Sequence, residues 1–169
     1  MAVSQQCSVM VMHSRVNSLL SSDFKFPRNH FSMDHPFVFH LVQASLWDET
    51  VAADSTYYPP TYDIDGFTHG TANPQKLLAV ANHFYPDVEG NWYCLKMTVE
   101  SLEATGVKTV FEGTAPVGDK QPDFEGSEDE LFPHILGGIK PAAVLAVQTV
   151  VRDADGTFTG IEGVTDSSS

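Results

Sequence analysis

The sequence predicts an α+β domain with small, split antiparallel sheets and two helices early in the chain. Segments with a strand pattern outnumber those with a helical pattern, which favours this class over a doubly wound parallel sheet. The composition, with 42% hydrophobic and 18% charged residues, is typical of a globular protein. A length of 169 residues suits one domain with a full core.

The chain is expected to divide into three stretches. Through residues 1–35, polar residues interrupt short apolar pieces and no helical or strand period persists, which predicts a disordered extension. The domain itself is expected at residues 36–163, followed by a frayed, Ser-rich end at 164–169. The first 22 residues contain no acid and one arginine, so they resemble an organelle transit peptide only weakly.

The first half of the domain combines one buried strand with two helices. Residues 37–42 are apolar on both faces and predict a central strand. A helix over 45–54 is expected to start at a capping box formed by Ser45 and Asp48. The next elements are an extended segment at 57–62, a turn at 63–66 and a short strand at 67–71. A second helix is expected to start at Asn73-Pro74 and to end before Pro86. Its apolar face consists of Leu77, Val80, Ala81 and Phe84.

The second half is expected to be mainly strands. The predicted strands span residues 92–99, 107–112, 142–151 and 157–161. Between them, the acidic segment 113–130 carries six carboxylates and is interpreted as a solvated surface, with a divalent-cation site as the alternative. The carboxylates do not follow the spacing of a calcium-binding loop.

The charge of the chain restricts its partners. A net charge of −13 repels nucleic acids and anionic membranes, so neither is expected as a partner. There are three arginines, Arg15, Arg28 and Arg152, which provides poorly for a highly phosphorylated ligand. A small molecule is therefore the expected partner, and the oligomeric state is left open.

Cysteine content and hydropathy indicate where in the cell the protein is expected. Cys7 and Cys94 form no disulfide framework, which favours a reducing, intracellular setting such as the cytoplasm. No apolar run approaches the roughly 20 residues that a membrane span needs.

Three histidines from separate segments are candidates for chemistry. His40 lies midway along the buried 37–42 strand, where its ring nitrogens need partners, so it is either a core histidine or a site residue. His134 lies between Pro133 and two glycines, in a loop that is expected to hold it in position. Glu112, at the end of its strand, is the carboxylate that could orient a histidine or act as a base.

The third histidine, His69, lies in a segment that also supplies candidate binding residues. Phe67, His69 and Thr71 share one face of the short strand, and the hydroxyl of Thr71 could help to orient a ligand. The flanking Gly66 and Gly70 leave room for a ligand or for another chain segment. Gly66, Phe67 and Thr71 are therefore candidate ligand-binding residues.

Several familiar kinds of active site find no support in the sequence. His-Glu-x-x-His and His-x-His spacings are absent, so no metal site is assigned. A Gly-x-Ser-x-Gly nucleophile turn, a Walker loop and a Gly-x-Gly-x-x-Gly motif are also absent.

Several of these residues also belong to motifs that resemble those of a known family. The order of motifs over roughly residues 37–152 resembles the domain of unknown function 952 family, and the motifs are Phe39-His40-Leu41, Trp47, Tyr58-Pro59-Pro60, Asp65-Gly66-Phe67-Thr68-His69, Ala81-Asn82-His83-Phe84-Tyr85 and Phe132-Pro133-His134. Where the family usually has Gly-Phe-Ile-His-Cys-Ser, this chain has Thr68, Gly70 and Thr71. A mechanism that needs a thiol at position 70 is therefore excluded.

The resemblance implies a fold similar to that of ADP-ribosyltransferases, which bind NAD between two small sheets. By that similarity, His40 would hold a ribose, and His69 and Thr71 would lie on the second motif strand. His134 and Glu112 would be candidates for the remaining catalytic position. The scarcity of arginine weakens an NAD interpretation, so no cofactor is assigned, with NAD as an alternative.

Three functional hypotheses remain after these observations. The first is an enzyme in which His40, His69 and His134 transfer protons on a small, largely neutral metabolite, in an isomerase, cyclase or lyase type of step. The second is an ADP-ribosyltransferase-like NAD domain that acts as a transferase or ligand sensor. The third is a non-catalytic interaction module whose histidines bond the core.

Overall fold

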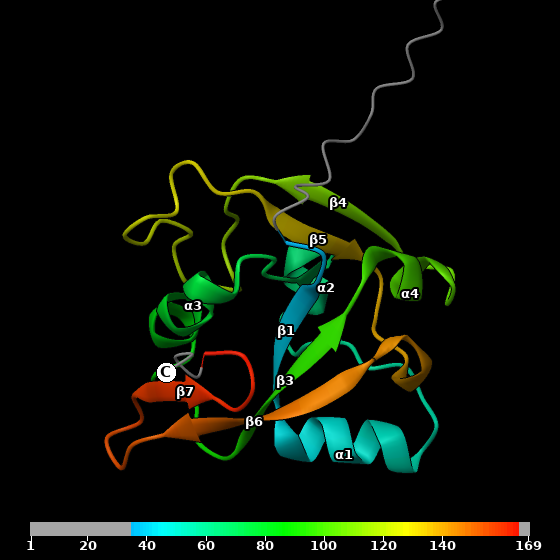
Figure 1. Cartoon of the computed structure of the whole chain (residues 1–169), viewed down its shortest axis with the longest axis horizontal. Helices are drawn as coiled ribbons and strands as arrows, with labels where there is room; N and C mark the ends of the chain where they lie inside the picture. Colours follow the sequence, from blue (N-terminus) through cyan, green and yellow to red (C-terminus); the bar gives the residue numbers. More distant parts are fainter. Residues whose placement is uncertain (1–34, 166–169) are drawn as a thin grey trace, which may run out of the picture. The chain divides into compact units, whose positions relative to one another are not determined.

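The structure, a computed structural model, describes residues 35–165. Most of the predicted extension, with His13 and His30, and residues 166–169 lie outside this range. The described residues form an α+β arrangement with two antiparallel sheets and few helices, as the sequence predicts (Figure 1). No helix among them is long and apolar enough to cross a membrane.

The two sheets are small and separate. The first has the strand order β1–β3–β6–β7, with β1 (Val38–Gln43), β3 (Trp92–Met97), β6 (Ala146–Arg152) and β7 (Phe158–Ile161). The second has the order β2–β5–β4, with β2 (Thr68–His69), β5 (Phe132–Leu136) and β4 (Lys108–Glu112). Main-chain bonds between Phe39 and Thr71, both 2.8 Å long, tie the edge of β1 to the segment after β2.

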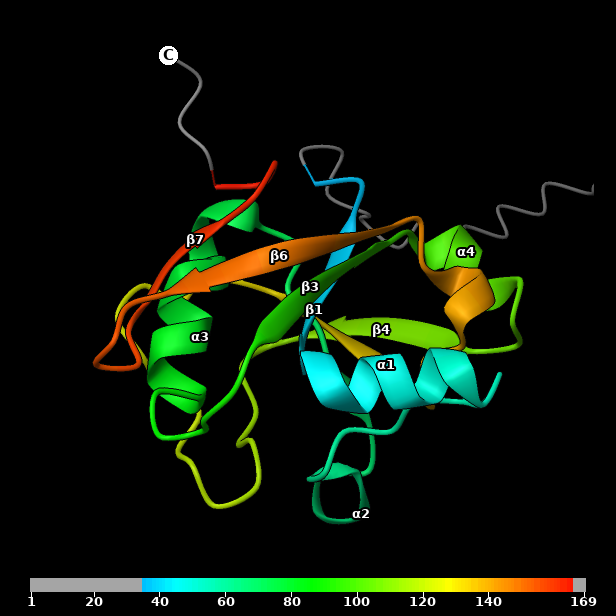
Figure 2. The ribbon, with the colours of Figure 1, turned by 90° about the horizontal axis from the view of Figure 1, so that it is seen from below.

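The helices are short and lie around the sheets. They are α1 (Ala44–Ala52), α2 (Tyr62–Asp65), α3 (Leu77–Phe84) and α4 (Val99–Glu103), with 3₁₀ turns η1 (Pro74–Lys76) and η2 (Pro141–Ala143). α3 lies beside β7, and α4 lies at the opposite end, near β4 (Figures 1 and 2).

Several predicted helix boundaries are wrong. α1 begins directly after β1, with Gln43 as the N-cap and no side-chain cap, so the capping box predicted at Ser45 does not form. The sequence does not predict α4, because this helix is only five residues long and its capping residue Thr98 lies within the predicted 92–99 strand. The predicted 142–151 strand begins only at Ala146, because a 3₁₀ turn precedes it. The cap at Asn73 is confirmed, since its side chain accepts from the main-chain N of Gln75 at 3.0 Å.

The two faces of β1 belong to two different cores, as its double apolar pattern predicts. Val38 and Val42 pack into one core, and Phe39 and Leu41 into the other. His40 points to the same side as Val38 and Val42 and is 4% exposed. The strand therefore brings an imidazole into the interior, where every polar atom needs a partner.

His134 lies in a strand and not in the predicted loop. It occupies the middle of β5, the central strand of the second sheet, paired with His69 on one side and Val110 on the other. Pro133 is compatible with this position because it contributes a carbonyl, which accepts from the N of Gly70 at 2.8 Å. The pairing holds His134 and His69 side by side on one face of the sheet.

Gly70 is required by the close approach of two strands. A Cβ atom there would lie 2.9 Å from the main-chain oxygen of Pro133 and 3.2 Å from a methyl group of Val38. We expect Gly70→Ala to lower the free energy of unfolding by about 2 kcal/mol. Denaturant titration of Gly113→Ala is the matched control, because that Cβ meets nothing within 4 Å; an equal effect of both changes would contradict the packing explanation.

Candidate functional site

A small hollow lies where β1 meets the second sheet. His40, His69 and His134 all line it, together with Gly70 and Thr71, and its volume is about 30 Å³. Aromatic side chains of α3 and β5 form much of its wall, and the acidic segment 113–130 contributes Thr114, Ala115, Val117 and Phe124. We call this space the histidine-lined hollow. A volume of this size has room for only a few water molecules.

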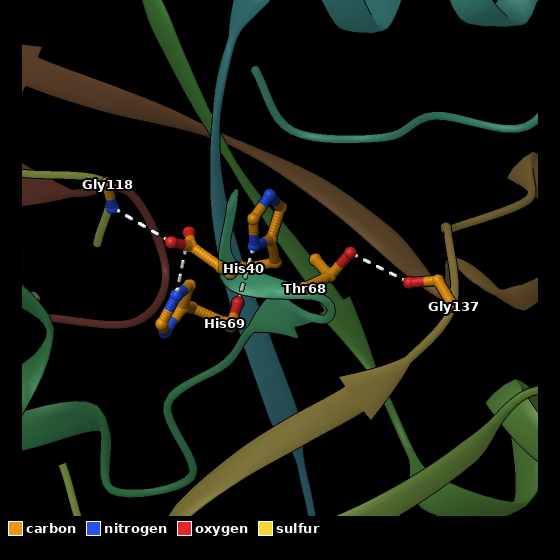
Figure 3. Close-up of polar contacts among 6 residues, drawn as sticks. His40, Thr68, His69, Gly118 and Gly137 are labelled. Atoms are coloured by element: carbon orange, nitrogen blue, oxygen red, sulfur yellow. Dashed lines mark hydrogen bonds and ion pairs between the residues drawn. The ribbon is translucent and has the colours of Figure 1, made fainter. Parts of the chain in front are cut away.

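Hydrogen bonding fixes the proton of His40. Its Nδ1 donates to the main-chain oxygen of His69 at 2.6 Å (Figure 3). Because a carbonyl can only accept, Nδ1 carries the proton and Nε2 has the lone pair of the neutral ring. Burial lowers the pKa of His40 to about 4, so the ring is neutral at pH 7.

His69 is paired with a buried carboxylate. Its Nε2 donates to Oδ2 of Asp65 at 3.1 Å, and the Asp65 side chain is 3% exposed. The other carboxylate oxygen accepts from the main-chain N of Gly118 at 3.0 Å (Figure 3). Burial lowers the pKa of His69 and outweighs the opposing attraction of Asp65. Asp65 therefore fixes the tautomer of His69 and attaches the acidic segment beside it.

His134 is oriented by the predicted carboxylate. Its Nδ1 donates to Oε2 of Glu112 at 3.0 Å, although the Glu112 side chain is 65% exposed. The ring of Phe67 stacks on that of His134, with centroids 4.1 Å apart. The rings of His69 and His134 lie 6.0 Å apart. Glu112 thus acts on the hollow through His134 and not by lining it.

Two imidazole nitrogens are buried without a partner. Within residues 35–165, Nε2 of His40 and Nε2 of His134 are sealed from solvent and accept no hydrogen bond. Such an atom usually costs about 1–3 kcal/mol, because it loses water and gains nothing. Nε1 of Trp92, Oγ1 of Thr109 and Oε1 of Gln148 are orphaned in the same way, so such an atom does not by itself indicate a ligand site.

A larger cleft continues from the hollow. It has a volume of about 400 Å³ and shares His40, Leu41, Phe84, Tyr85 and Val117 with the hollow. The remaining walls include Tyr57, Pro59, Pro60, Ile64 and Trp92, so we call it the aromatic cleft. Its size is in the range of small-molecule sites.

Two tyrosines of the cleft remain protonated phenols at neutral pH. Burial raises the pKa of Tyr85, and the nearby charge of Asp65 raises it further. Burial likewise raises the pKa of Tyr57. Both side chains can therefore act as hydrogen-bond donors to a molecule in the cleft.

The three candidate binding residues lie in different places. Thr71 lines the hollow and is 4% exposed. Phe67 covers His134 without lining either cavity, and Gly66 caps α2 with a φ of 78°. The space beside Gly70 is occupied by Pro133 and Val38. This is the second of the two alternatives that the sequence left open, a ligand or another chain segment.

Asp65 is a site residue that the sequence reasoning missed. Its sequence context indicates only a turn, whereas it lies in the last position of α2 and holds His69. The helical i, i+4 rule would not have indicated the pair, because the chain leaves α2 through Gly66 and enters β2 before it reaches His69.

The described residues contain no group of three or more His, Cys, Asp or Glu placed to hold a metal ion. In the acidic segment, five carboxylates are exposed, which agrees with the solvated-surface interpretation. The sixth, Glu130, accepts from Nδ2 of Asn73 at 3.2 Å.

A family profile matches the part of the chain that forms this site. The family is described as "Protein of unknown function (DUF952)", and its profile matches residues 41–147. The chain belongs to the DUF952 family. The matched range includes His69 and His134 and begins one residue after His40.

Two solved structures resemble this DUF952 chain. Protein CC0527 from Caulobacter crescentus has 18% sequence identity and a TM-score of 0.55, and the match covers 73% of this chain and 93% of that one. A double mutant of the same protein gives a TM-score of 0.51 with the same identity and coverage. At this identity the likeness shows a shared fold only. The comparison with curated proteins finds no match.

Proposed function

We propose that this DUF952 chain is an enzyme that transfers a proton on a small metabolite held in the hollow and the adjoining cleft. The observation that supports it best is the meeting of His40, His69 and His134 at one hollow. Each ring is held by a hydrogen bond, so its orientation is fixed before a substrate arrives. The reaction would be of the isomerase, cyclase or lyase type.

His69 is the base in this proposal. Its Nε2 is held by Asp65, so its Nδ1 carries the lone pair when the ring is neutral. Its side chain is 16% exposed, whereas that of His134 is 5% exposed. A proton removed from the substrate by Nδ1 produces an imidazolium that Asp65 stabilises, and the same nitrogen returns the proton to another atom of the substrate. His40 and His134 form the neighbouring walls of the hollow.

The one described cysteine is unsuited to covalent catalysis. Cys94 is fully buried in the core on the far face of β1 from His40. Burial raises the pKa of its thiol to about 12, so the reactive thiolate is scarce at neutral pH. A proton transfer without a covalent intermediate is the simpler use of these residues.

Deuterium incorporation tests the proposal even though the substrate is unidentified. The full chain is incubated with a metabolite extract in D₂O, and metabolites are compared by mass spectrometry. We expect at least one metabolite to gain deuterium or to rearrange with the wild type. His69→Gln should abolish this change, because the base is lost, and His134→Gln should slow it.

His83→Gln is the matched control for these variants. His83 donates to the main-chain oxygen of Gln121 and does not line the hollow, so turnover should persist. Folding of each variant is checked by thermal melting. Absence of any wild-type reaction, or a reaction that survives in His69→Gln, would contradict histidine-based proton transfer.

A second candidate is an NAD-binding domain of the ADP-ribosyltransferase type. The position of the hollow between two small antiparallel sheets, with His40 on the first strand, favours it. Calorimetry with millimolar NAD is the test, with heat of binding expected to disappear in His40→Ala. No heat from the folded wild type would exclude this candidate.

A further inference from the structure

Tyr85 lies where the hollow and the cleft join. It is the residue that follows α3, and it lines both the histidine-lined hollow and the aromatic cleft. His69, the proposed base, lines the hollow, and Tyr57 lines the cleft. The ring of Tyr85 packs against that of Trp92, with centroids 4.8 Å apart. A molecule that extends from the cleft toward His69 therefore passes this tyrosine.

The hydroxyl group of Tyr85 is unpaired and open. Within residues 35–165, the hydroxyls of Tyr85 and Tyr57 have no hydrogen-bond partner, and neither is sealed from solvent as Nε2 of His40 is. Burial is the main cause of the raised pKa of both phenols, and smaller effects act between Tyr57 and Tyr85 and between Tyr85 and Asp65. Such effects act between neighbouring groups, so the Tyr85 hydroxyl lies near Tyr57 and near the carboxylate that holds His69.

The cleft offers hydrogen-bond donors but little charge. Of the described residues that line it, Asp119 and Lys120 are the acidic and basic ones, and both are exposed. Lys120 is also paired with Asp87, at 3.0 Å. The protonated phenols provide donors within the otherwise largely apolar walls. An uncharged group with lone pairs fits these donors, since a charged group would lose its water here without meeting an opposite charge.

We infer that Tyr85 is a further catalytic residue, which donates a hydrogen bond to a carbonyl oxygen of the substrate while His69 removes a proton from the carbon beside that carbonyl. This inference rests on the proposed function and narrows its substrate to an uncharged carbonyl compound. A carbonyl is also what makes a neighbouring C–H group acidic enough to lose its proton to an imidazole.

The step is an enolisation. Nδ1 of His69 takes the proton, the electrons of the C–H bond form a C=C bond, and the carbonyl oxygen becomes an oxyanion. The O–H group of Tyr85 stabilises this oxyanion, with the O–H group of Tyr57 as the second donor. Return of the proton from His69 to a carbon of the enolate restores the carbonyl.

Two probes of nearly equal shape test the donor without a known substrate. Acetophenone and α-methylstyrene share a flat ring and a trigonal head, which is C=O in the first and C=CH₂ in the second. With acetophenone labelled with ¹³C at the carbonyl, we expect the carbonyl signal to move downfield when it binds the full-length protein, because a hydrogen bond polarises the carbonyl. Tyr85→Phe should remove most of this shift and weaken acetophenone at least about fivefold, the loss of one neutral hydrogen bond.

Two comparisons separate a hydrogen bond from a change of shape. Binding of α-methylstyrene should change less than about twofold in Tyr85→Phe, because this ligand has no acceptor. Tyr58→Phe is the matched control, since Tyr58 is 52% exposed and lines neither cavity, and thermal melting checks the folding of both variants. Absence of a carbonyl shift in the wild type, or equal weakening of both probes in Tyr85→Phe, overturns the inference.

The deuterium experiment gives the catalytic test. Tyr85→Phe should slow the incorporation at least about hundredfold, as the loss of an oxyanion donor usually does, and the deuterium should lie on a carbon next to a carbonyl or conjugated with it. Incorporation that depends on His69 but is unchanged in Tyr85→Phe overturns this inference and leaves the proton-transfer proposal standing. The two failures are therefore distinguishable.

Discussion

Replacing Arg152 by methionine is expected to lower the free energy of unfolding by about 3 kcal/mol, since bonds from a charged donor to main-chain carbonyls are among the stronger ones in proteins. The guanidinium donates to the main-chain oxygens of four residues, Pro86, Val88, Gly90 and Gly156, at 2.6 to 3.4 Å. It also lies 4.3 Å from the ring centroid of Phe158. Methionine keeps the packing and removes every donor.

Denaturant titration measures this effect, and two variants show its origin. Arg152→Lys keeps the charge but not the planar fork, so it should recover less than half of the loss. Lys108→Met removes a cation from an exposed position on β4 and should change stability by at most about 0.5 kcal/mol. A similar loss in Lys108→Met would show that net charge, and not the carbonyl cage, is responsible.

The same arginine shows what composition alone could not reveal. The scarcity of arginine predicted a protein poorly equipped for phosphates, and Arg152, the one arginine in the described residues, is fully engaged with main-chain oxygens. Its role depends on four main-chain carbonyls. Three of them lie 62 to 66 residues away along the chain, and the fourth, that of Gly156, lies 4 residues away. No local pattern encodes such an arrangement.

Local patterns were sufficient where a strand has a distinctive composition. The apolar residues on both faces of the 37–42 segment predicted a strand buried on both faces, and β1 lies between two cores. The short helix α4 and the position of His134 in β5 were missed for a common reason. Their structure comes from packing and pairing with distant segments, since β5 is held by β2 and β4 on either side.

The sequence indicated residues of the candidate site, but not the partners of those residues. His40 was singled out because a buried ring needs partners, His69 and His134 because their neighbours leave room or hold them, and Glu112 as a carboxylate that could orient a histidine. Their actual bonds could not be read from the sequence: His40 donates to the main chain of His69, which is 29 residues away. Asp65 was not singled out, and its bond to the main-chain N of Gly118 spans 53 residues.

His40 should make the protein less stable in acid. Its pKa is 6.5 when exposed and about 4 in the folded protein. Between those values the unfolded chain binds a proton that the folded chain does not, so stability falls as the pH decreases from 6.5 to 4. Lowering the pKa by this amount decreases the free energy of unfolding by about 3 kcal/mol below pH 4.

The variant His40→Asn isolates this contribution. Its amide can still donate to the main-chain oxygen of His69 but cannot take up a proton near neutral pH. Denaturant titrations at pH 7 and pH 4.5 should therefore show a smaller acid loss in His40→Asn than in the wild type, by about 2 kcal/mol. The lowered pKa of His69 contributes an acid loss to both proteins and cancels in the comparison.

The free energy of unfolding of His40→Asn at pH 7 distinguishes a site histidine from a purely structural one. If the ring serves a ligand, His40→Asn should keep most of the stability at pH 7, because its amide keeps the bond to the main-chain oxygen of His69 and its side-chain oxygen replaces Nε2 as the one unpaired acceptor. Unfolding of His40→Asn at pH 7 would instead support the interaction module whose histidines only bond the core. Parallel pH profiles of the two proteins would show that His40 is not held neutral by burial, and the assignment of a bare Nε2 at the hollow would then be wrong.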